Sequence, residues 1–341
     1  MKKIRTEDAV GQVLCHDMTQ IIPGQYKGPR FRKGHIVTPE DIPVLLSMGR
    51  ENLYVWELEP GKLHENEAAE RLCALCRNDG MGRTEVREGK IELLAERPGL
   101  FRVDRRRLNA VNAVDELMIA TRRGDTAVRP GDKLAGMRVI PLVIEEAKLA
   151  EAERLAGGRP LLELLPFRLR RAGVVTTGSE VFSGRVEDAF TPVLVKKLAD
   201  YGIEVTEHIT VGDGLEQIRA AVERLRETDV ELILCTGGMS VDPDDNTPGA
   251  IKAAGARVVT YGAPVLPGAM FLLGYFADGA PIAGLPGCVM YAKATIFDLV
   301  LPRIAAGIEL TRADFTAMGE GGLCLGCEPC VWPRCPFGGR G

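Results

Sequence analysis

The sequence has no long hydrophobic run and no excess of basic charge. No apolar stretch approaches the length of a membrane-spanning helix. Residues 1–8 turn acidic before any apolar segment begins, and this order excludes a signal peptide. The 43 Lys and Arg are outnumbered by 47 Asp and Glu, which gives a net charge of -4 and no global basic field to attract nucleic acid or anionic lipid. We therefore expect a cytoplasmic protein that binds neither nucleic acid nor membranes.

Histidine is scarce, and internal repeats are absent. His64 precedes an expected helix and is better explained as its cap than as a ligand between domains. His16, His35 and His208 form no visible ligand set, and no segment of the chain repeats. Hydrophobic residues make up 45% of the chain and charged residues 26%, which is the composition of an ordinary globular protein. At about 150 residues per domain, the 341 residues predict two domains or more.

Nine cysteines without an export signal favour thiols or metal ligands over a disulfide framework. Cys73 and Cys76 recur with Ala69 and Leu72 at helical spacing, so residues 67–77 are expected to form a helix with both thiols in its buried stripe. A core role is favoured for that pair.

Four further cysteines are concentrated near the end of the chain, at Cys324, Cys327, Cys330 and Cys335. Their two overlapping two-residue spacings are more typical of iron–sulfur runs than of the paired knuckles of zinc sites. The last spacing is one residue longer than in the bacterial ferredoxin run, so an iron–sulfur cluster, zinc and no metal all stay open. We expect residues 311–341 to form a Cys-rich, metal-binding tail.

The composition changes twice before this tail. Residues 1–145 predict a mixed α/β region, and the charged, Ala-rich residues 146–170 predict a linker helix that is broken at Gly157 and Gly158. From residue 171 to 310, apolar strands at 173–177, 203–209 and 230–235 alternate with amphipathic helices. Asp213 and Glu216 are the expected capping pair of one of these helices. The alternation predicts an α/β fold in which a parallel sheet is covered by helices on both faces, a doubly wound three-layer domain.

Two Gly-rich turns follow expected strands of this domain, and in open α/β sheets ligands bind outside the carboxyl ends of the strands. Glycines and small hydroxyl residues let backbone N–H groups approach a phosphate closely. Each turn alone is equally well explained as a tight loop that needs Gly, but two turns at equivalent strand ends favour a phosphate site. The turns are Thr176-Thr177-Gly178-Ser179-Glu180 and Thr236-Gly237-Gly238-Met239-Ser240.

Three carboxylates, Asp242, Asp244 and Asp245, follow the second turn. They would repel a phosphate unless a hard cation such as Mg²⁺ bridged the carboxylate and phosphate oxygens. Helix capping by Asp245 is the alternative.

Taken in order, these motifs resemble the molybdopterin-binding domain shared by molybdopterin adenylyltransferases, molybdopterin molybdenumtransferases and a nicotinamide-nucleotide amidase family. The resemblance covers about 140 residues and depends on the order and spacing of several motifs. The motif set is Thr177-Gly178-Ser179-Glu180, Gly184, Asp188, Thr236-Gly237-Gly238, Ser240, Asp245-Asn246-Thr247-Pro248, Pro267-Gly268 and Leu285-Pro286-Gly287.

The resemblance implies a role for each matching residue. The turn from Thr177 to Glu180 would bind the phosphate or pyrophosphate end of the pterin, and Asp188 and Asp245 match the family's catalytic or metal-binding acids. In a molybdenumtransferase-like enzyme, Asp188, Asp245 and Asp242 would hold Mg²⁺ near the pyrophosphate, and Asp242 is included on the chemistry of the acidic loop and not on the resemblance. The remaining ligand-binding positions are Gly178 and Ser179 in the first turn, Gly237, Gly238 and Ser240 in the phosphate turn, and Pro267, Gly268, Pro286 and Gly287 in the pocket wall.

The position of this domain in the second half of the chain is similar to the layout of the molybdenumtransferases. In that family, Mg²⁺ and molybdate act on adenylylated molybdopterin, molybdenum is inserted into the dithiolene, and AMP is released. Relatives commonly oligomerise, so a homo-oligomer is an expectation from the resemblance.

The chain departs from the family at Asp242, where Gly is usual, and at Cys288, where Asn is usual. It also lacks a segment like the transferases' N-terminal signature and has no room for the β domain that usually follows. A non-catalytic carrier or sensor of the cofactor is therefore the alternative. Nucleotide hydrolysis, as in the amidase relatives, is a third possibility. Those enzymes carry an additional amidase domain, for which this chain has no room.

Overall fold

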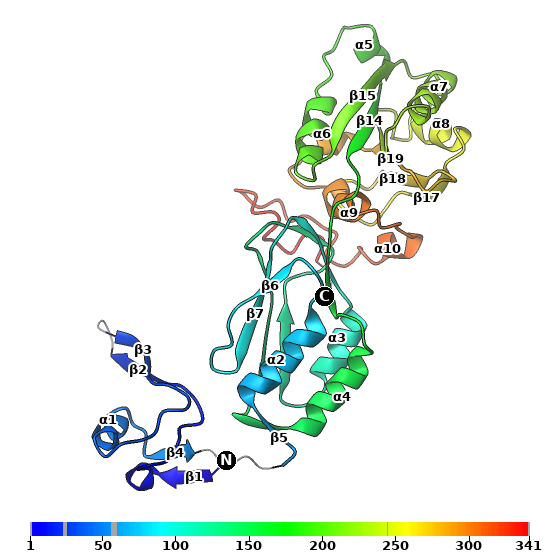
Figure 1. Cartoon of the computed structure of the whole chain (residues 1–341). Coiled ribbons are helices and arrows are strands. Elements are labelled where there is room, and N and C mark those ends of the chain that lie inside the picture. Colours follow the sequence, from blue (N-terminus) through cyan, green and yellow to red (C-terminus); the bar gives the residue numbers. More distant parts are fainter. Residues whose placement is uncertain (1, 23–25, 56–59, 244, 340–341) are drawn as a thin grey trace. The chain divides into compact units, whose positions relative to one another are not determined.

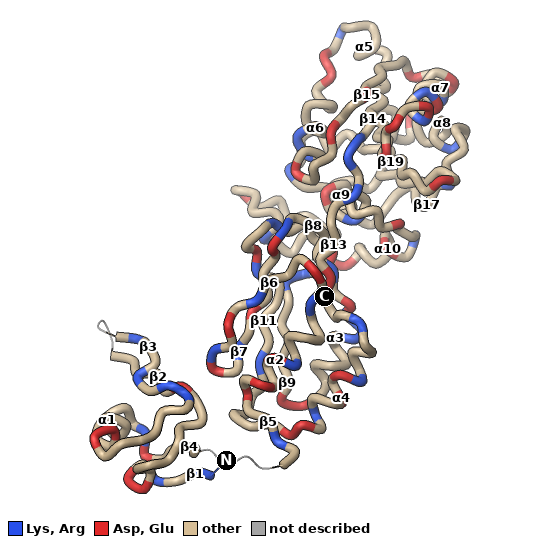
Figure 2. Tube along the Cα trace, viewed as in Figure 1, with Lys and Arg blue, Asp and Glu red and all other residues tan. Residues whose placement is uncertain are grey.

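The computed structural model describes residues 2–22, 26–55, 60–243 and 245–339, in two compact units (Figure 1). Within these residues, no helix combines the length and the apolar character needed to cross a membrane. Acidic and basic residues are interspersed along both units (Figure 2). The first unit comprises Met1–Glu96, Val103–Arg122 and Pro130–Leu164, and the second comprises Arg97–Arg102, Arg123–Arg129 and Leu165–Gly341.

The N-terminal part of the first unit contains two antiparallel strand pairs, β1 with β4 and β2 with β3. Its small core includes the fully buried Leu14, Leu45 and Leu53. Its elements are β1 (Lys2–Arg5), η1 (Thr6–Asp8), β2 (Met18–Ile22), β3 (Tyr26–Phe31), α1 (Asp41–Ser47) and β4 (Asn52–Val55).

The rest of the first unit is built on a four-stranded antiparallel sheet in the order β6-β7-β11-β9, against which α2 packs. Cys73 and Cys76 lie in α2 and are buried, as the apolar spacing predicts. Gly157 ends α4 in the left-handed conformation that glycine adopts without strain. The elements are β5 (Lys62–His64), α2 (Glu65–Cys76), β6 (Met81–Arg83), β7 (Lys90–Ala95), α3 (Arg105–Asn112), β9 (Leu117–Thr121), β11 (Lys133–Val139), β12 (Val143–Glu145), α4 (Glu146–Ala156) and β13 (Leu162–Leu165).

The second unit is centred on a six-stranded sheet in the order β15-β14-β16-β19-β18-β17. Outside this sheet, the short strand β8 (Gly99–Val103) pairs antiparallel with β10 (Thr126–Val128). The other elements are β14 (Arg171–Thr177), α5 (Ser179–Phe182), α6 (Phe190–Ala199), β15 (Glu204–Val211), α7 (Leu215–Arg226), β16 (Leu232–Thr236), α8 (Thr247–Ala253), β17 (Arg257–Tyr261), β18 (Leu272–Tyr275), β19 (Pro281–Leu285), η2 (Gly287–Met290), α9 (Ile296–Ala305) and α10 (Arg312–Thr316).

Alternate residues of the central strands face two separate cores, because successive side chains of a strand point to opposite faces of the sheet. Val174 and Leu234 lie in one core with residues of α6 and α9. Their neighbours Val175 and Cys235 lie in the other core with residues of α7 and α8. Helices therefore cover both faces, and the predicted doubly wound three-layer α/β architecture is confirmed.

Two details of that prediction are wrong. The sheet is mixed, because β18 runs antiparallel to both of its neighbours, β17 and β19. Asp213 and Glu216 do not cap α7, whose N-cap is Gly214 and has no side-chain cap hydrogen bond. The carboxylate of Asp213 is used elsewhere.

The end of the chain contributes to the core beneath α6 and α9. Phe315, Met318 and Phe337 are buried in the same cluster as Phe271 and Phe297. Within residues 312–339, these large apolar side chains thus pack against the sheet domain.

Candidate functional site

The carboxyl ends of four parallel strands meet at one edge of the sheet in the second unit. The registers pair Thr176 of β14 with Thr236 of β16, and Thr236 with Leu285 of β19. From β14 the chain goes to β15 on one side, and it then crosses to β16 on the other side of β14. This reversal is the topological switch point at which open α/β sheets bind ligands.

Two buried hydroxyl groups lie at this switch point. Thr177 and Thr236 are 5% and 1% exposed, and their Oγ1 atoms have no hydrogen-bond partner within the described residues. Buried polar groups are nearly always paired, because an unpaired one loses its bonds to water without replacement. A polar ligand at the strand ends would supply the partner.

The two Gly-rich turns that were predicted to cooperate touch each other. Gly237 has φ +83, and a Cβ at this position would lie 2.4 Å from the carbonyl oxygen of Thr177. Gly238 has φ +56, and its Cβ would lie 2.8 Å from Oγ1 of Thr247. Both the left-handed backbone and the close approach of the turns therefore require glycine.

Side-chain hydrogen bonds connect the turns after β14, β15 and β16. Oδ2 of Asp213 accepts hydrogen bonds from the backbone N–H of Ser179 at 2.8 Å and from its hydroxyl at 2.7 Å. Nδ2 of Asn246 donates to the carbonyl oxygen of Asp213 at 2.9 Å, and Oγ1 of Thr247 donates to the carbonyl oxygen of Gly237 at 2.9 Å. The site is thus a connected set of turns, in which Asp213 has a role that the sequence analysis missed.

Asp188 holds the first turn of α6. Its Oδ1 accepts from the backbone N–H groups of Phe190 and Thr191 at 2.8 and 3.0 Å, and its Oδ2 accepts from the hydroxyls of Thr191 at 2.6 Å and Thr176 at 3.0 Å. Nε2 of His208 lies 3.3 Å from Oδ2. Burial favours a raised pKa for Asp188, but these hydrogen bonds to the ionised form outweigh it and hold the pKa below the usual value.

The acidic loop after β16 is more open. Oδ2 of Asp245 accepts from the backbone N–H of Asp242 at 3.3 Å, while Asp242 is exposed; Asp244 lies outside the described residues. The Tyr261 hydroxyl donates to the carbonyl oxygens of Met239 and Ser240, and burial, together with the charge of Asp245, raises the pKa of this hydroxyl.

The remaining predicted positions lie at the same edge of the sheet. Pro286 and Gly287 directly follow β19, and the connection containing Pro267 and Gly268 leads into β18 at its end nearest Gly284. Gly268 has φ +118, and a Cβ there would lie 2.6 Å from Cγ2 of Ile296. The structure therefore brings the residues of all the predicted turns to the edge of the sheet where the parallel strands end.

Residues 173–306 match the family model described as "probable molybdopterin binding domain". This segment is a domain of that family. We refer to it below as the family domain. Residues 3–57 match a second model, which is described as a domain of unknown function.

Curated relatives match a short segment of the chain. CinA-like proteins of Mycobacterium avium and Mycobacterium tuberculosis are 42% and 41% identical to it over 78 residues. The match covers 23% of this chain but only 18% of each relative.

Solved structures similar to the family domain include the molybdopterin biosynthesis enzyme MoaB of Thermus thermophilus, with 22% identity and a TM-score of 0.35 over 41% of this chain and 98% of that one. The Mog protein of Mycobacterium ulcerans has 22% identity and a TM-score of 0.34 over 40% and 94%. CinA of Thermoplasma acidophilum, described as having unknown function, has 18% identity and a TM-score of 0.35 over 40% and 98%.

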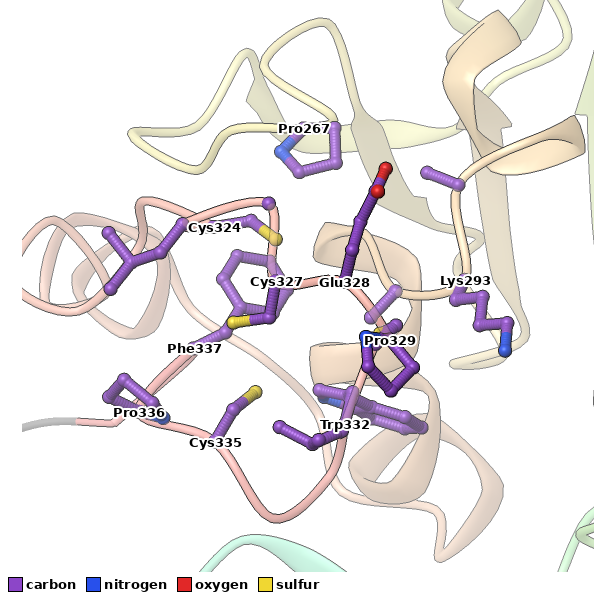
Figure 3. Close-up of a pocket in the computed structure, with 16 residues that line it drawn as sticks. Pro267, Lys293, Cys324, Cys327, Glu328, Pro329, Trp332, Cys335, Pro336 and Phe337 are labelled. Atoms are coloured by element: carbon purple, nitrogen blue, oxygen red, sulfur yellow. The ribbon is translucent and has the colours of Figure 1, made fainter.

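The four tail cysteines lie around a cavity that also reaches one of the predicted pocket-wall residues, Pro267. Cys324, Cys327, Cys330 and Cys335 all line one cavity of about 400 Å³, which also includes Pro267 (Figure 3). All are free thiols, and Cys327 and Cys330 are exposed. Among the residues that the structure describes, no group of three or more His, Cys, Asp or Glu side chains is arranged to hold a metal ion.

Proposed function

We propose that this protein binds molybdopterin at the turns that follow β14 and β16 and acts in molybdenum cofactor biosynthesis. The observation that carries this proposal is the pair of buried hydroxyls of Thr177 and Thr236, one on each side of the switch point, for which the described part of the chain offers no hydrogen-bond partner. They belong to the family domain, whose description supports a molybdopterin ligand.

The phosphate end of the ligand is assigned to the two Gly-rich turns. Backbone N–H groups of Gly178 and Gly238 belong to turns where glycine permits close approach, and such concave turns bind anions. Asp213 fixes Ser179 in place and thereby prepares the first turn for its ligand. Glu180 and Ser240 complete these turns, while Pro267, Gly268, Pro286 and Gly287 form the wall for the rest of the pterin.

The acidic loop is the proposed Mg²⁺ site. Magnesium is commonly bound by one or two carboxylates together with water and ligand phosphates, so Asp242 and Asp245 fit it without a third protein carboxylate. Asp242 is exposed, and Asp245 has one carboxylate oxygen, Oδ1, outside its hydrogen bond with the Asp242 N–H. When bound, Mg²⁺ would neutralise phosphate charge next to this loop.

The activity that fits these ligands is molybdate insertion into adenylylated molybdopterin with release of AMP. Asp245 is the acid we assign to this reaction, because it is on the loop that leads from the phosphate turn to α8. The substrates are adenylylated molybdopterin and molybdate.

A non-catalytic carrier or sensor of the cofactor is the second candidate, and the bonding of Asp188 favours it. Both oxygens of this carboxylate accept hydrogen bonds, and two of the donors are N–H groups of the first turn of α6. Asp188 therefore holds the first turn of α6 in place, which is a structural role, whereas a transferase would use this residue as a reactive acid.

The test is to incubate the purified full chain with adenylylated molybdopterin, Mg²⁺ and molybdate while pterin binding and AMP release are measured. The test variant is Asp245→Asn. The matched control is Asp229→Asn, an exposed acid before β16, at the amino ends of the strands.

AMP release that is lost in Asp245→Asn and retained in Asp229→Asn supports the transferase. Tight pterin binding without AMP release supports the carrier or sensor. If neither molybdopterin nor its adenylylated form binds, the proposed function is wrong.

A further inference from the structure

The tail forms a closed loop that carries four of the nine cysteines. The N–H of Gly338 donates to the carbonyl oxygen of Gly321 at 2.8 Å, which joins the two ends of the loop. All four of Cys324, Cys327, Cys330 and Cys335 fall between these glycines. We call residues 321–338 the cysteine loop.

Backbone hydrogen bonds hold the start of the cysteine loop against Leu266. The N–H of Leu266 donates to the carbonyl oxygen of Gly322, and the N–H of Cys324 donates to the carbonyl oxygen of Leu266, both at 2.8 Å. At the other end, Nη1 of Arg123 donates to the carbonyl oxygen of Phe337 at 2.9 Å, and Phe337 is buried. Backbone hydrogen bonds and the buried Phe337 thus hold the loop in place without a contribution from its thiols.

The cavity between the loop, Pro267 and residues 292–294 suits sulfur ligands. It is lined mainly by apolar and sulfur-containing side chains, and Glu328 is the one charged residue that the loop itself places there (Figure 3). The indole Nε1 of Trp332 is buried and has no hydrogen-bond partner within the described residues. A buried N–H donor beside cysteines fits a sulfur acceptor, because hydrogen bonds to metal-bound sulfur are a common feature of thiolate and iron–sulfur sites.

We infer that the cysteine loop binds a soft metal centre through the four thiolates of Cys324, Cys327, Cys330 and Cys335. Structural zinc and iron–sulfur clusters are both bound by four thiolates, and these four cysteines can supply that ligand set for either. Metal binding displaces the thiol protons. It also draws the four sulfurs together, because in this structure they line the cavity without being close enough to hold one metal ion. Trp332 donates its N–H to one of the bound sulfurs.

The cysteine cavity and the proposed pterin site are neighbours, because Pro267 lines the cavity and is also assigned to the wall of the pterin site. The metal test below is made without a pterin and does not depend on pterin binding. The full chain is purified without oxygen, and zinc, iron and acid-labile sulfide are measured before and after reconstitution with zinc alone or with iron and sulfide. About one zinc per chain, or iron with a matching amount of sulfide and visible charge-transfer absorption, is the expected result. The first outcome assigns zinc and the second an iron–sulfur cluster.

Single Ser substitutions test the ligand set. Cys324→Ser, Cys327→Ser, Cys330→Ser and Cys335→Ser are each expected to lower metal content severalfold, whereas Cys288→Ser, at a partly exposed thiol outside the loop, retains it. A chain that takes up neither zinc nor iron overturns the inference, as does a metal that stays bound in all four variants.

Misfolding of a variant is distinguished from loss of a ligand by a measurement on the natural chain. Alkylation of the native protein followed by mass spectrometry identifies which thiols the metal covers. Metal loading should protect the four loop cysteines together, and unchanged labelling of Cys327 and Cys330, which are exposed, contradicts their assignment as ligands.

Discussion

Asp213 holds Ser179 through a single carboxylate oxygen, which accepts from both the backbone N–H and the hydroxyl of that residue. The contact spans two turns that follow different strands, β14 and β15. It fixes the part of the first Gly-rich turn that we assign to the phosphate of the ligand.

Replacement of Asp213 by Ala should weaken molybdopterin binding. Hydrogen bonds to a charged group contribute roughly 1.5 to 3 kcal/mol, so we expect the dissociation constant to rise by about 10-fold or more. Titration of the full chain with molybdopterin measures this. Asp229→Ala removes an exposed acid at the opposite ends of the strands and should leave the constant unchanged. Equal binding by both variants would contradict the role of Asp213.

Gly237→Ala should destabilise the protein more than Gly255→Ala does. Both glycines have a left-handed backbone, φ +83 and +89, but only at Gly237 does an added Cβ meet neighbouring atoms. The conformational cost of about 1 to 2 kcal/mol is common to both, and the contact with Thr177 adds about 1 to 3 kcal/mol at Gly237. Denaturant unfolding measures the two free energies. Equal losses would show that the turns separate at no cost.

Asp188→Asn should lose stability at neutral pH and lose little in acid. The pKa of Asp188 is lowered in the folded protein, so its contribution is present above the unfolded pKa of about 3.9 and disappears as the pH falls through the lower folded value. The gap in unfolding free energy between the natural chain and the variant should therefore shrink below about pH 4. Because His208 also contacts the Asp188 carboxylate, both proteins in this comparison should carry His208→Gln. A gap that is constant with pH would argue against the charged interaction.

Native alkylation should separate the cysteines into two groups. Burial raises the pKa of Cys76 and of Cys235 to about 12, so few of these thiols are ionised near neutral pH and reagents cannot reach them. Cys327 and Cys330 are exposed. In metal-free protein, mass spectrometry should find the two loop cysteines labelled well before Cys76 and Cys235. Labelling of all four at similar rates would indicate that the core opens readily.

The layers of the sheet domain could be predicted because strand and helix periodicities alternate clearly from residue 171 onward. The direction of β18 could not be predicted from its apolar residues, which are buried on both faces whether a strand is parallel or antiparallel. A usable signal lay in the short connection to β19. Asp278-Gly279 separates two apolar runs, and Gly279 takes φ +86 in the turn.

The candidate site was predictable to the extent that it depends on glycines and on strand ends. Gly237 and Gly238 were identified because short-range geometry demands glycine there. Asp213 was assigned to a helix cap because its spacing from Glu216 is a local pattern, whereas its partner Ser179 is 34 residues away in the chain. Contacts between loops that are distant in sequence leave no periodic trace.

The burial of Phe315, Met318 and Phe337 beneath α9 has a practical consequence for expression. A fragment cut to residues 173–306, the span of the family match, would leave Phe271 and Phe297 without these neighbours and give solvent a large apolar surface. Such a fragment is expected to aggregate. A workable minimal module has to keep the chain through Phe337, and also Leu100, which packs into the same core from β8.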